Sequence, residues 1–225
     1  MRAVDPQQIQ DLAQMKIIAI IQARMGSSRL PGKVMADICG KPLLQYVVDR
    51  VERSNVDEIV VACPEADWDK IKIDHREYRI PTMVEFLPGD ENDVAGRFAK
   101  VLLRHPCDAF VRVCADSPLI DAETVIEAIT FWHNSEFSYS VSTHPTGSAE
   151  VVDVAVFREA VSEMGPFNRE HVTTYWRSHF PQSVCSGMPK LTIDVQGDLE
   201  RVRGIVSRMT KPHVAYGWNE CLLLA

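Results

Sequence analysis

The residue types best suited to chemistry gather in one short segment near the amino terminus, residues 24–33. Three cationic side chains, two glycines and two serines occupy its ten positions. Glycine lets a backbone approach a ligand closely, and successive N–H groups can form an anion-binding concavity. Arg24, Arg29 and Lys33 could neutralise a polyphosphate there, the arginines through forked contacts to its oxygens. The segment therefore predicts a phosphate-binding loop, with a solvated basic turn as the alternative.

The spacing within this segment excludes two common phosphate-binding motifs. A P-loop has four residues between its glycines and a hydroxyl residue after its lysine. Here five residues separate Gly26 from Gly32, and Val34 follows Lys33. The dinucleotide fingerprint G-x-G-x-x-G is also absent. A phosphate site in this segment would have to be of another kind.

Two aspartates at predicted strand ends could complete such a site. Asp116 follows one apolar run, and Asp194 lies in another. A carboxylate at the end of a buried strand has to be solvated, hydrogen-bonded or bound to a cation. Mg²⁺ prefers oxygen ligands and often takes only one or two carboxylates beside phosphate oxygens. Asp116 and Asp194 are therefore candidate metal ligands, whereas Asp121 and Asp198 are explained as residues at helix starts.

The elements that must position these residues follow from the hydrophobic pattern. Strands are expected at residues 16–22, 58–63, 82–87, 109–114, 137–142, 151–157 and 191–195. Helices are expected at residues 42–53, 92–104, 122–133, 169–178 and 198–209, and a loop at residues 144–148. This alternation predicts an α/β fold with a mainly parallel sheet, a small antiparallel extension and helices on both faces. Ligands of such sheets bind beyond the carboxyl ends of the strands, and this placement favours the phosphate loop over the basic turn.

Composition and charge limit the partners. A net charge of -7 argues against a general nucleic-acid binder. Six cysteines without a C-x-x-C pair, several of them inside apolar runs, indicate free thiols in a reducing compartment. The sequence also shows no signal peptide and no apolar stretch long enough to span a bilayer. We expect a cytoplasmic protein with no membrane partner, in which residues 1–15 are an extension and residues 16–225 form one domain.

Several segments form an ordered set along the chain. The first is QARMGSSRLPGK at residues 22–33, and the others follow at residues 40–44, 91–98, 112–121, 169–173 and 192–199. Together they resemble the spore-coat polysaccharide biosynthesis (SpsF-type) cytidylyltransferases, relatives of the CMP-sialic-acid and CMP-Kdo synthetases. The resemblance implies a Rossmann-like GT-A nucleotidyltransferase fold, a three-layer sandwich. It also implies a Mg²⁺-dependent transfer of CMP from CTP to an acidic sugar, with release of pyrophosphate, for surface polysaccharide or glycan biosynthesis. A homodimer is expected, as in related synthetases.

The resemblance also implies roles for individual residues. Those implied to bind the nucleotide are Gln22, Ala23, Arg24, Gly26, Ser27, Arg29, Lys33 and Asp116, and those implied in catalysis are Arg24, Arg29, Lys33 and Asp116. The implied metal ligands are Asp116 and Asp194, and the residues implied on the acceptor side are Asp153, Arg169, Glu170 and His171. For His171 a packing or capping role is the alternative.

Two features depart from the family pattern. The family usually carries a glutamate two residues after the aspartate that corresponds to Asp153, and here that position is Ala155. Residues 64–79 also lack the Ser/Thr- and Asp-rich pattern that is usual in the family. Two other functions stay open. A GT-A glycosyltransferase would share the sheet, but it normally carries a D-x-D motif where Asp116-Ser117-Pro118 stands. A nucleotide-binding module without catalysis is the second, and Ala155 is the feature that favours it.

Overall fold

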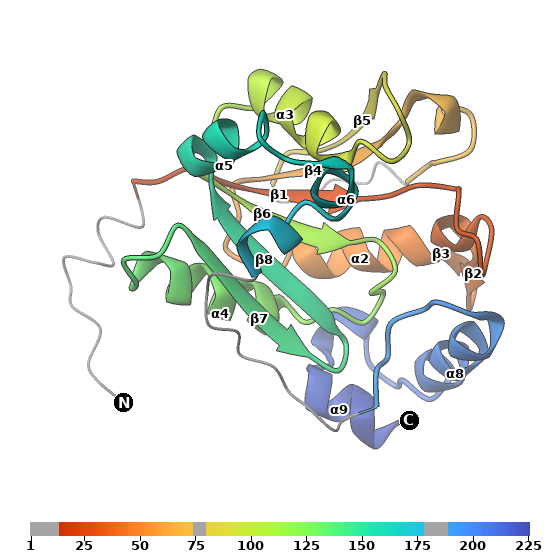
Figure 1. Ribbon diagram of the computed structural model, residues 1–225. Helices are drawn as coiled ribbons and strands as arrows, with labels where there is room; N and C mark the ends of the chain where they lie inside the picture. Colours follow the sequence, from red (N-terminus) through yellow and green to blue (C-terminus); the bar gives the residue numbers. More distant parts are fainter. Residues whose placement is uncertain (1–13, 74–79, 178–188) are drawn as a thin grey trace.

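The computed structural model describes residues 14–73, 80–177 and 189–225 (Figure 1). A six-stranded sheet crosses the molecule in the order β5-β4-β1-β6-β8-β7. Its strands are β1 (Ile17–Gln22), β4 (Glu58–Pro64), β5 (Thr82–Leu87), β6 (Ala109–Cys114), β7 (Tyr139–His144) and β8 (Gly147–Asp153). The first four strands of the order are parallel, and β8 and β7 add an antiparallel edge. The mainly parallel sheet with an antiparallel extension is as predicted.

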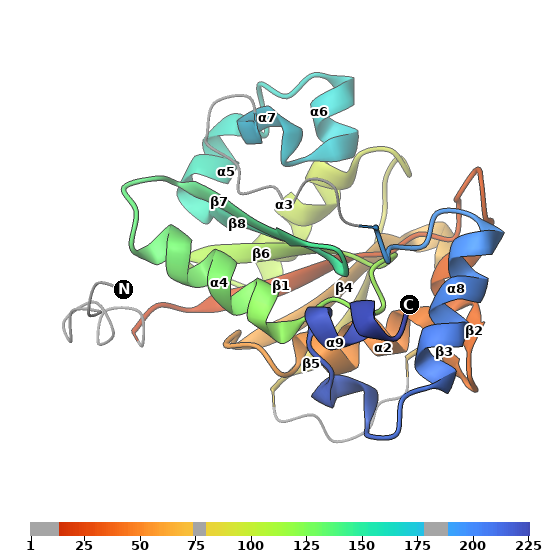
Figure 2. The same ribbon diagram turned by 90° about the horizontal axis from the view of Figure 1, so that it is seen from below.

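Helices cover both faces of the sheet and make it a three-layer structure. One face packs against α2 (Leu43–Val51), α4 (Ala122–His133), α8 (Gln196–Ser207) and α9 (Trp218–Leu223). The other packs against α3 (Val94–Arg104), α5 (Val154–Ala160) and α7 (Thr174–Arg177), and α6 (Pro166–His171) lies against α3. In Figure 1, α8 and α9 lie below the sheet and α3 lies above it, and Figure 2 shows α6 and α7 on the opposite side of the sheet from α9. Because both faces are covered, the central strands are almost wholly apolar, which is why they were readable from sequence.

Edge-to-face aromatic contacts anchor the second layer. Phe110 on β6 packs between Phe98 of α3 and Phe157 of α5, with ring centroids 5.6 Å and 5.1 Å away. All three side chains are fully buried. Each such ring removes a large apolar area from water and adds a directional contact to its neighbour. These contacts fix α3 and α5 over the end of the sheet where β6 begins.

Short elements complete the described part. The loop after β1 ends in η1 (Lys33–Met35), and a small hairpin of β2 (Asp37–Ile38) and β3 (Lys41–Pro42) leads into α2. η2 (Glu65–Asp67) follows β4, and η3 (His213–Ala215) precedes α9. None of the helices in the described ranges is long and apolar enough to cross a membrane. The described cysteines are all free, whereas Cys185 and residues 1–13 of the predicted extension lie outside the described residues.

The strand predicted at residues 151–157 is wrong in its second half. β8 ends at Asp153, and α5 begins at the next residue. Oδ1 of Asp153 accepts hydrogen bonds from the backbone N–H groups of Ala155 (2.8 Å) and Val156 (3.3 Å). The aspartate therefore caps the helix, and a β-branched apolar run becomes helical because its cap and its packing outweigh its strand propensity. The loop predicted at residues 144–148 is likewise a tight hairpin turn, since His144 pairs with Gly147.

Two further predictions are corrected close to the site. Residues 191–195 form no strand: the N–H of Leu191 binds the carbonyl of Pro145 (2.7 Å), and that of Ile193 binds the carbonyl of Asp116 (2.8 Å). Because the backbone of residues 191–195 bonds to two separate segments, its side chains alternate between buried and less buried although no strand pairs with it. The helix predicted at residues 169–178 is two short helices, α6 and α7, because Val172 between them has φ 39°. Residue 178 lies outside the described range.

The cap at Asp153 gives a stability prediction. Asp153→Ala should lower the free energy of unfolding by about 1 kcal/mol, because the first N–H groups of α5 lose their acceptor. Asp153→Ser should retain most of it, since a serine hydroxyl can accept the same bonds. Urea denaturation followed by circular dichroism measures both. If Asp153→Ala kept the wild-type stability but lost turnover, the capping role would be refuted and a role of Asp153 in binding the acceptor would be supported.

Candidate active site

The loop after β1 is fixed by its own backbone and by one buried carboxylate. The N–H of Ala23 binds the carbonyl of Ala62 (3.1 Å), which extends the β1–β4 pairing by one residue. The N–H of Met25 then donates to Oδ2 of Asp67 (2.9 Å), and Gly32 closes the loop by donating to the carbonyl of Met25 (2.9 Å). Gly32 has φ 73°, a conformation that favours glycine. Asp67, which sequence reasoning passed over, belongs to the stretch that departs from the family pattern.

Arg24 ties this loop to the segments that begin α3 and end α6. Its Nη1 donates to Oδ1 of Asn92 (3.2 Å), and its Nη2 lies 3.5 Å from Oε1 of Glu170. Gly26 lies so close to this neighbourhood that a Cβ at its position would be 1.9 Å from Oε1 of Glu91. Gly26 therefore permits the close approach expected of it, although the group it approaches is a carboxylate.

The remaining cations of the loop meet the two predicted metal ligands. Nζ of Lys33 lies 3.1 Å from Oδ2 of Asp116 and 3.2 Å from Oδ1 of Asp194, and it donates to the carbonyl of Ile193 at 2.6 Å. Nη2 of Arg29 lies 2.9 Å from Oδ1 of Asp194. The Lys33 side chain is 12% exposed, so this contact is largely shielded from water. Residues from both ends of the chain thus converge at the carboxyl ends of β1 and β6.

A pocket of about 300 Å³ opens at this convergence. The predicted residues that line it are Gln22, Arg24, Ser27, Arg29, Lys33, Asp116, His171 and Asp194. Those that line it without having been predicted are Ser28, Val34, Arg112, Cys114 and Ala115. The pocket lies where ligands of doubly wound sheets bind, and its lining carries four cationic side chains and two carboxylates.

Arg169 and Glu170, two of the residues implied on the acceptor side, form ion pairs and do not line the pocket. Arg169 binds Asp93, the N-cap of α3, through Nε to Oδ1 (2.8 Å) and Nη2 to Oδ2 (3.0 Å). Glu170 faces Arg24 of the loop. His171, the last residue of α6, does line the pocket. The Arg169–Glu170–His171 block therefore joins α6 to α3 and to the loop, and only its histidine reaches the pocket.

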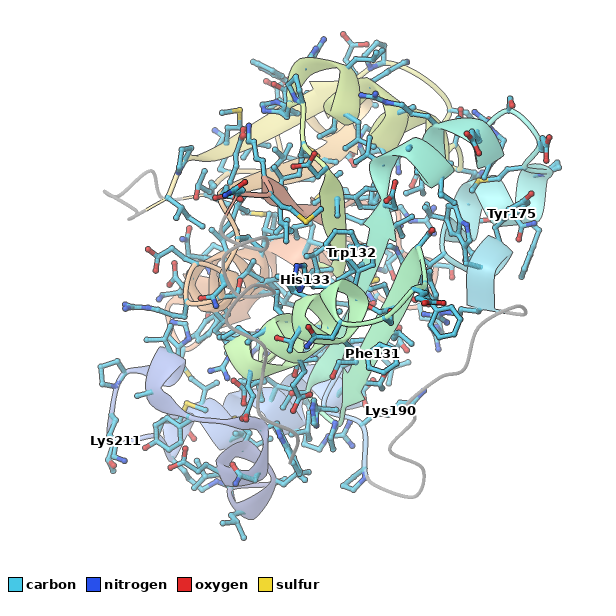
Figure 3. The ribbon with its side chains drawn as sticks, turned by 90° about the vertical axis from the view of Figure 1, so that its left-hand side faces the viewer. Phe131, Trp132, His133, Tyr175, Lys190 and Lys211 are labelled. Atoms are coloured by element: carbon cyan, nitrogen blue, oxygen red, sulfur yellow. The ribbon has the colours of Figure 1, made fainter. Side chains whose placement is uncertain are left out.

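Asp153 is not brought to this site. It pairs with Ala109, the first residue of β6, whereas Asp116 follows the last. β8 runs antiparallel to β6, so the final residue of β8 lies beside the start of β6, at the end of the strands away from the pocket. There Asp153 borders a separate cavity beside Trp132 and His133, which are labelled in Figure 3. Within one chain its position does not support contact with an acceptor at the pocket, and the same holds for Ala155.

Sequence reasoning also missed a buried ion cluster beneath the pocket. Nε of Arg112 donates to Oε1 of Gln22 (3.1 Å), and its Nη1 binds Oε2 of Glu150, which also pairs with Arg177. Burial by itself raises the pKa of the Glu150 carboxyl, but Arg112 and Arg177 outweigh it and hold that pKa below its ordinary value. Charged residues inside the runs AFVRVC and GSAEVVD were the available signal. Their pairing depends on the antiparallel register, which no motif revealed.

The oxygen atoms around Lys33 suit a divalent cation as well as an ammonium group. Asp116 and Asp194 supply carboxylates and Ile193 a carbonyl, the hard donors that Mg²⁺ prefers. Among the residues that the structure describes, no group of three or more His, Cys, Asp or Glu could hold a metal by itself. The two aspartates therefore fit a Mg²⁺ ion whose other ligands come from phosphate and water.

Comparison with known proteins decides the family. The family model described as cytidylyltransferase matches residues 18–204. The chain belongs to the cytidylyltransferases. It is thus a nucleotidyltransferase, and both the predicted family and the predicted enzyme class are confirmed. A glycosyltransferase using a nucleotide-sugar donor is disfavoured on the same ground.

Two curated proteins illustrate how far the similarity reaches. The cytidylyltransferase is 29% identical over 211 residues to the spore coat polysaccharide biosynthesis protein SpsF of Bacillus subtilis, covering 85% of this chain and 87% of SpsF. It is 40% identical over 116 residues to the 3-deoxy-manno-octulosonate cytidylyltransferase of Geobacter sulfurreducens. That second match covers 51% of this chain and 44% of the relative, so the chain matches less than half of the relative's length.

Solved structures confirm the predicted fold. A cytidylyltransferase from Leptospira borgpetersenii superposes with a TM-score of 0.75 at 20% identity, over 94% of both chains. The CMP:2-keto-3-deoxy-manno-octonic acid synthetase complexed with CTP superposes with a TM-score of 0.62 at 16% identity, over 86% of this chain and 99% of that one. At these identities the match establishes the nucleotidyltransferase fold of the cytidylyltransferase.

The thiol that lines the pocket gives a pH prediction. Burial, together with Asp116 and against Arg112, raises the pKa of the Cys114 thiol to about 11. At pH 8 only about one such thiol in a thousand is ionised, so iodoacetamide should modify exposed Cys39 well before Cys114. The rate at Cys114 should rise as pH approaches its pKa. Peptide mapping by mass spectrometry measures both rates, and fast modification of Cys114 at pH 7 would contradict the assignment.

Proposed function

We propose that this cytidylyltransferase transfers CMP from CTP to an acidic sugar, with release of pyrophosphate and with Mg²⁺ as its metal. The contact of Lys33 and Arg29 with Asp116 and Asp194 in one pocket is the observation that carries the proposal. Cations that can grip phosphate oxygens lie beside carboxylates that can hold a divalent ion. That combination suits a nucleoside triphosphate with its metal.

The proposed nucleotide site follows from the present partners of its cations. Lys33 and Arg29 are paired with carboxylates, and Arg24 faces Glu170. A bound triphosphate would offer these side chains phosphate oxygens in place of carboxylate oxygens. Gln22 and Ser27, also on the lining, would add polar contacts, and Ala23 and Gly26 would shape the backbone that approaches the phosphates.

The proposed chemistry is one displacement at phosphorus. The acceptor hydroxyl oxygen forms a bond to the α-phosphorus of CTP as the bond to pyrophosphate breaks in line, and the hydroxyl proton is released. Arg29 and Lys33 neutralise the charge that develops on the leaving pyrophosphate, and the pocket positions the reactants. When bound between Asp116 and Asp194, Mg²⁺ would supply further charge neutralisation at the phosphate oxygens.

Related proteins support the substrate class and the metal. SpsF of Bacillus subtilis is named for spore coat polysaccharide biosynthesis, and the Geobacter sulfurreducens relative for a sugar acid, 3-deoxy-manno-octulosonate. A structure of Rv0371c from Mycobacterium tuberculosis, which shares the fold at a TM-score of 0.58, is a complex with manganese. These names favour an acidic sugar and a divalent cation for this chain. The homodimer, the cytoplasmic location and the domain boundary after residue 15 stay predictions.

The position of Ala155 weakens the case for a module without catalysis. Ala155 lies at the start of α5, at the edge of the sheet opposite the pocket. The glutamate missing there therefore removes no carboxylate from the Lys33 neighbourhood, where Asp116 and Asp194 are both present. The one sequence feature that favoured an inactive protein does not reach the site.

Substrate use can be tested by pyrophosphate release. We expect release with CTP in Mg²⁺ when the acceptor is a sugar acid, with 3-deoxy-manno-octulosonate and N-acetylneuraminate as first probes and mannose as the neutral control. A coupled phosphate assay with each of the four nucleoside triphosphates measures this. A preference for UTP or GTP, or turnover of mannose alone, would refute the proposed substrates.

The roles of Arg29 and Asp116 can be tested by substitution. Arg29→Ala and Asp116→Ala should each lower kcat at least about a hundredfold, because each removes a charge from the reacting phosphates or their metal. Arg53→Ala and Asp69→Ala are matched controls outside the pocket lining and should keep wild-type turnover. Steady-state kinetics with CTP, checked by circular dichroism for folding, gives the comparison. Wild-type kcat in either pocket variant would remove that residue from the site.

A further inference from the structure

Glu150 is a buried acid whose carboxylate joins several parts of the chain behind the pocket. The residue is 1% exposed and lies on β8. Its Oε2 accepts hydrogen bonds from Nη1 of Arg112 and from Oγ1 of Thr173 (2.8 Å). Its Oε1 accepts from Nε of Arg177 (2.8 Å) and from the hydroxyl of Tyr139 (3.1 Å). Every partner comes from a different segment, so this one carboxylate links β6, β7, α7 and the residues that join α6 to α7.

Arg112 connects this carboxylate to the β1 side of the pocket. Both Arg112 and Gln22 line the pocket, and Nε of Arg112 donates to Oε1 of Gln22 at 3.1 Å. The Gln22 oxygen is thereby fixed as an acceptor, which leaves its amide N–H groups for a ligand. Nη2 of Arg112 makes no hydrogen bond to any residue in the described ranges, and the side chain is 10% exposed. Arg112 therefore both orients a lining residue and presents a donor of its own.

Thr173 connects the same carboxylate to the α6 side. The residue before it, Val172, has φ 39° and ψ -71°, a conformation that a β-branched residue rarely adopts. Backbone strain of this kind persists only where the surroundings over-determine it. Here the Val172 side chain is fully buried, and Thr173 is held by Glu150. His171, directly before the strained residue, lines the pocket, so its position depends on that restraint.

The charges of the cluster make the two sides respond together. Two guanidinium groups, Arg112 and Arg177, share the single carboxylate of Glu150. Removing that negative charge would leave two guanidinium groups close together without their common partner, and one of them, Arg112, is largely buried. Arg112 and α7 would then move apart, and Gln22 and His171 would lose their restraints in one event. The surplus positive charge also suits a pocket for anionic substrates.

We propose that Glu150 is a positioning residue for the pocket. Through Arg112 it orients Gln22, and through Thr173 it places His171, without touching a substrate itself. The inference rests on the proposed function for what binds in the pocket, namely CTP and its acceptor. Its structural content, that one carboxylate sets two lining residues, can be tested without any substrate.

The test compares Glu150→Gln with Glu127→Gln in the full-length chain. Glu127 is a suitable control because it binds Ser142 and His144 and does not line the pocket. We expect Glu150→Gln to raise the Kd for CTP, measured calorimetrically in Mg²⁺, by about tenfold. We also expect the ring resonance of His171 in ¹H–¹³C spectra, assigned with His171→Gln, to shift or broaden. Glu127→Gln should keep both wild-type values.

A second pair of variants separates positioning from simple stability. Thr173→Val removes the hydroxyl at nearly constant volume, and with it the bond to Glu150 and one contact from Nη1 of Arg112 (3.2 Å). It should shift the His171 resonance while leaving the CTP Kd within about twofold, because the Arg112–Glu150 and Arg112–Gln22 contacts remain. Thr173→Ser restores the hydroxyl and should restore the resonance. This pair also decides the matter if Glu150→Gln fails to fold. A merely structural role would lower the melting temperature of the variants and leave the His171 resonance and the CTP Kd unchanged.

The outcomes distinguish the inference from the proposed function. If the wild-type chain does not bind CTP, the proposed function fails. The His171 spectra would still test whether Glu150 positions His171. A wild-type His171 resonance in folded Glu150→Gln, or in Thr173→Val, would overturn the inference even if CTP binds. A shifted resonance with an unchanged CTP Kd in Glu150→Gln would overturn the Arg112 branch.

Discussion

The ammonium group of Lys33 lies among three oxygen atoms from two distant segments, and the pocket takes its shape from this contact. Asp116 follows β6, whereas Ile193 and Asp194 lie in an irregular stretch near the end of the chain. Without a cation between them, Asp116 and Asp194 would be two neighbouring carboxylates in a partly shielded place, which is unfavourable. The lysine therefore holds the loop after β1, the end of β6 and residues 191–195 in one arrangement.

The fold supplies the rigidity that this contact requires. β1 and β6 are paired along their whole lengths and buried on both faces, so the points where the chain leaves them are fixed. The loop itself is irregular, but backbone hydrogen bonds at Ala23 and Gly32 and the Asp67 carboxylate restrain it. Cationic side chains on such a loop are placed before any ligand arrives, which reduces the ordering cost of binding.

The sequence allowed the parallel half of the fold and most of the pocket to be predicted, for identifiable reasons. Strands buried on both faces are continuous apolar runs, and the bounds of β5, β6 and α4 agree with their predicted ranges. The pocket lining was predictable because carboxyl ends of parallel strands meet at one edge. Asp153, which the resemblance implies on the acceptor side, ends an antiparallel strand and therefore lies at the opposite end of β6 from the pocket. Glu150 and Arg112 escaped notice because their pairing depends on strand register.

The hydrogen bond from Met25 to Asp67 has an evolutionary consequence. The segment after β4 is one of the two places where the chain departs from the pattern of its family, and yet it provides the carboxylate that anchors the glycine-rich loop. The anchor requires one acid at one position and leaves its neighbours open to change. Divergence between relatives in this segment is therefore a poor measure of divergence in what the segment does. The sequence of the segment differs from the family pattern, whereas the hydrogen bond that Asp67 accepts from Met25 still holds the loop in place.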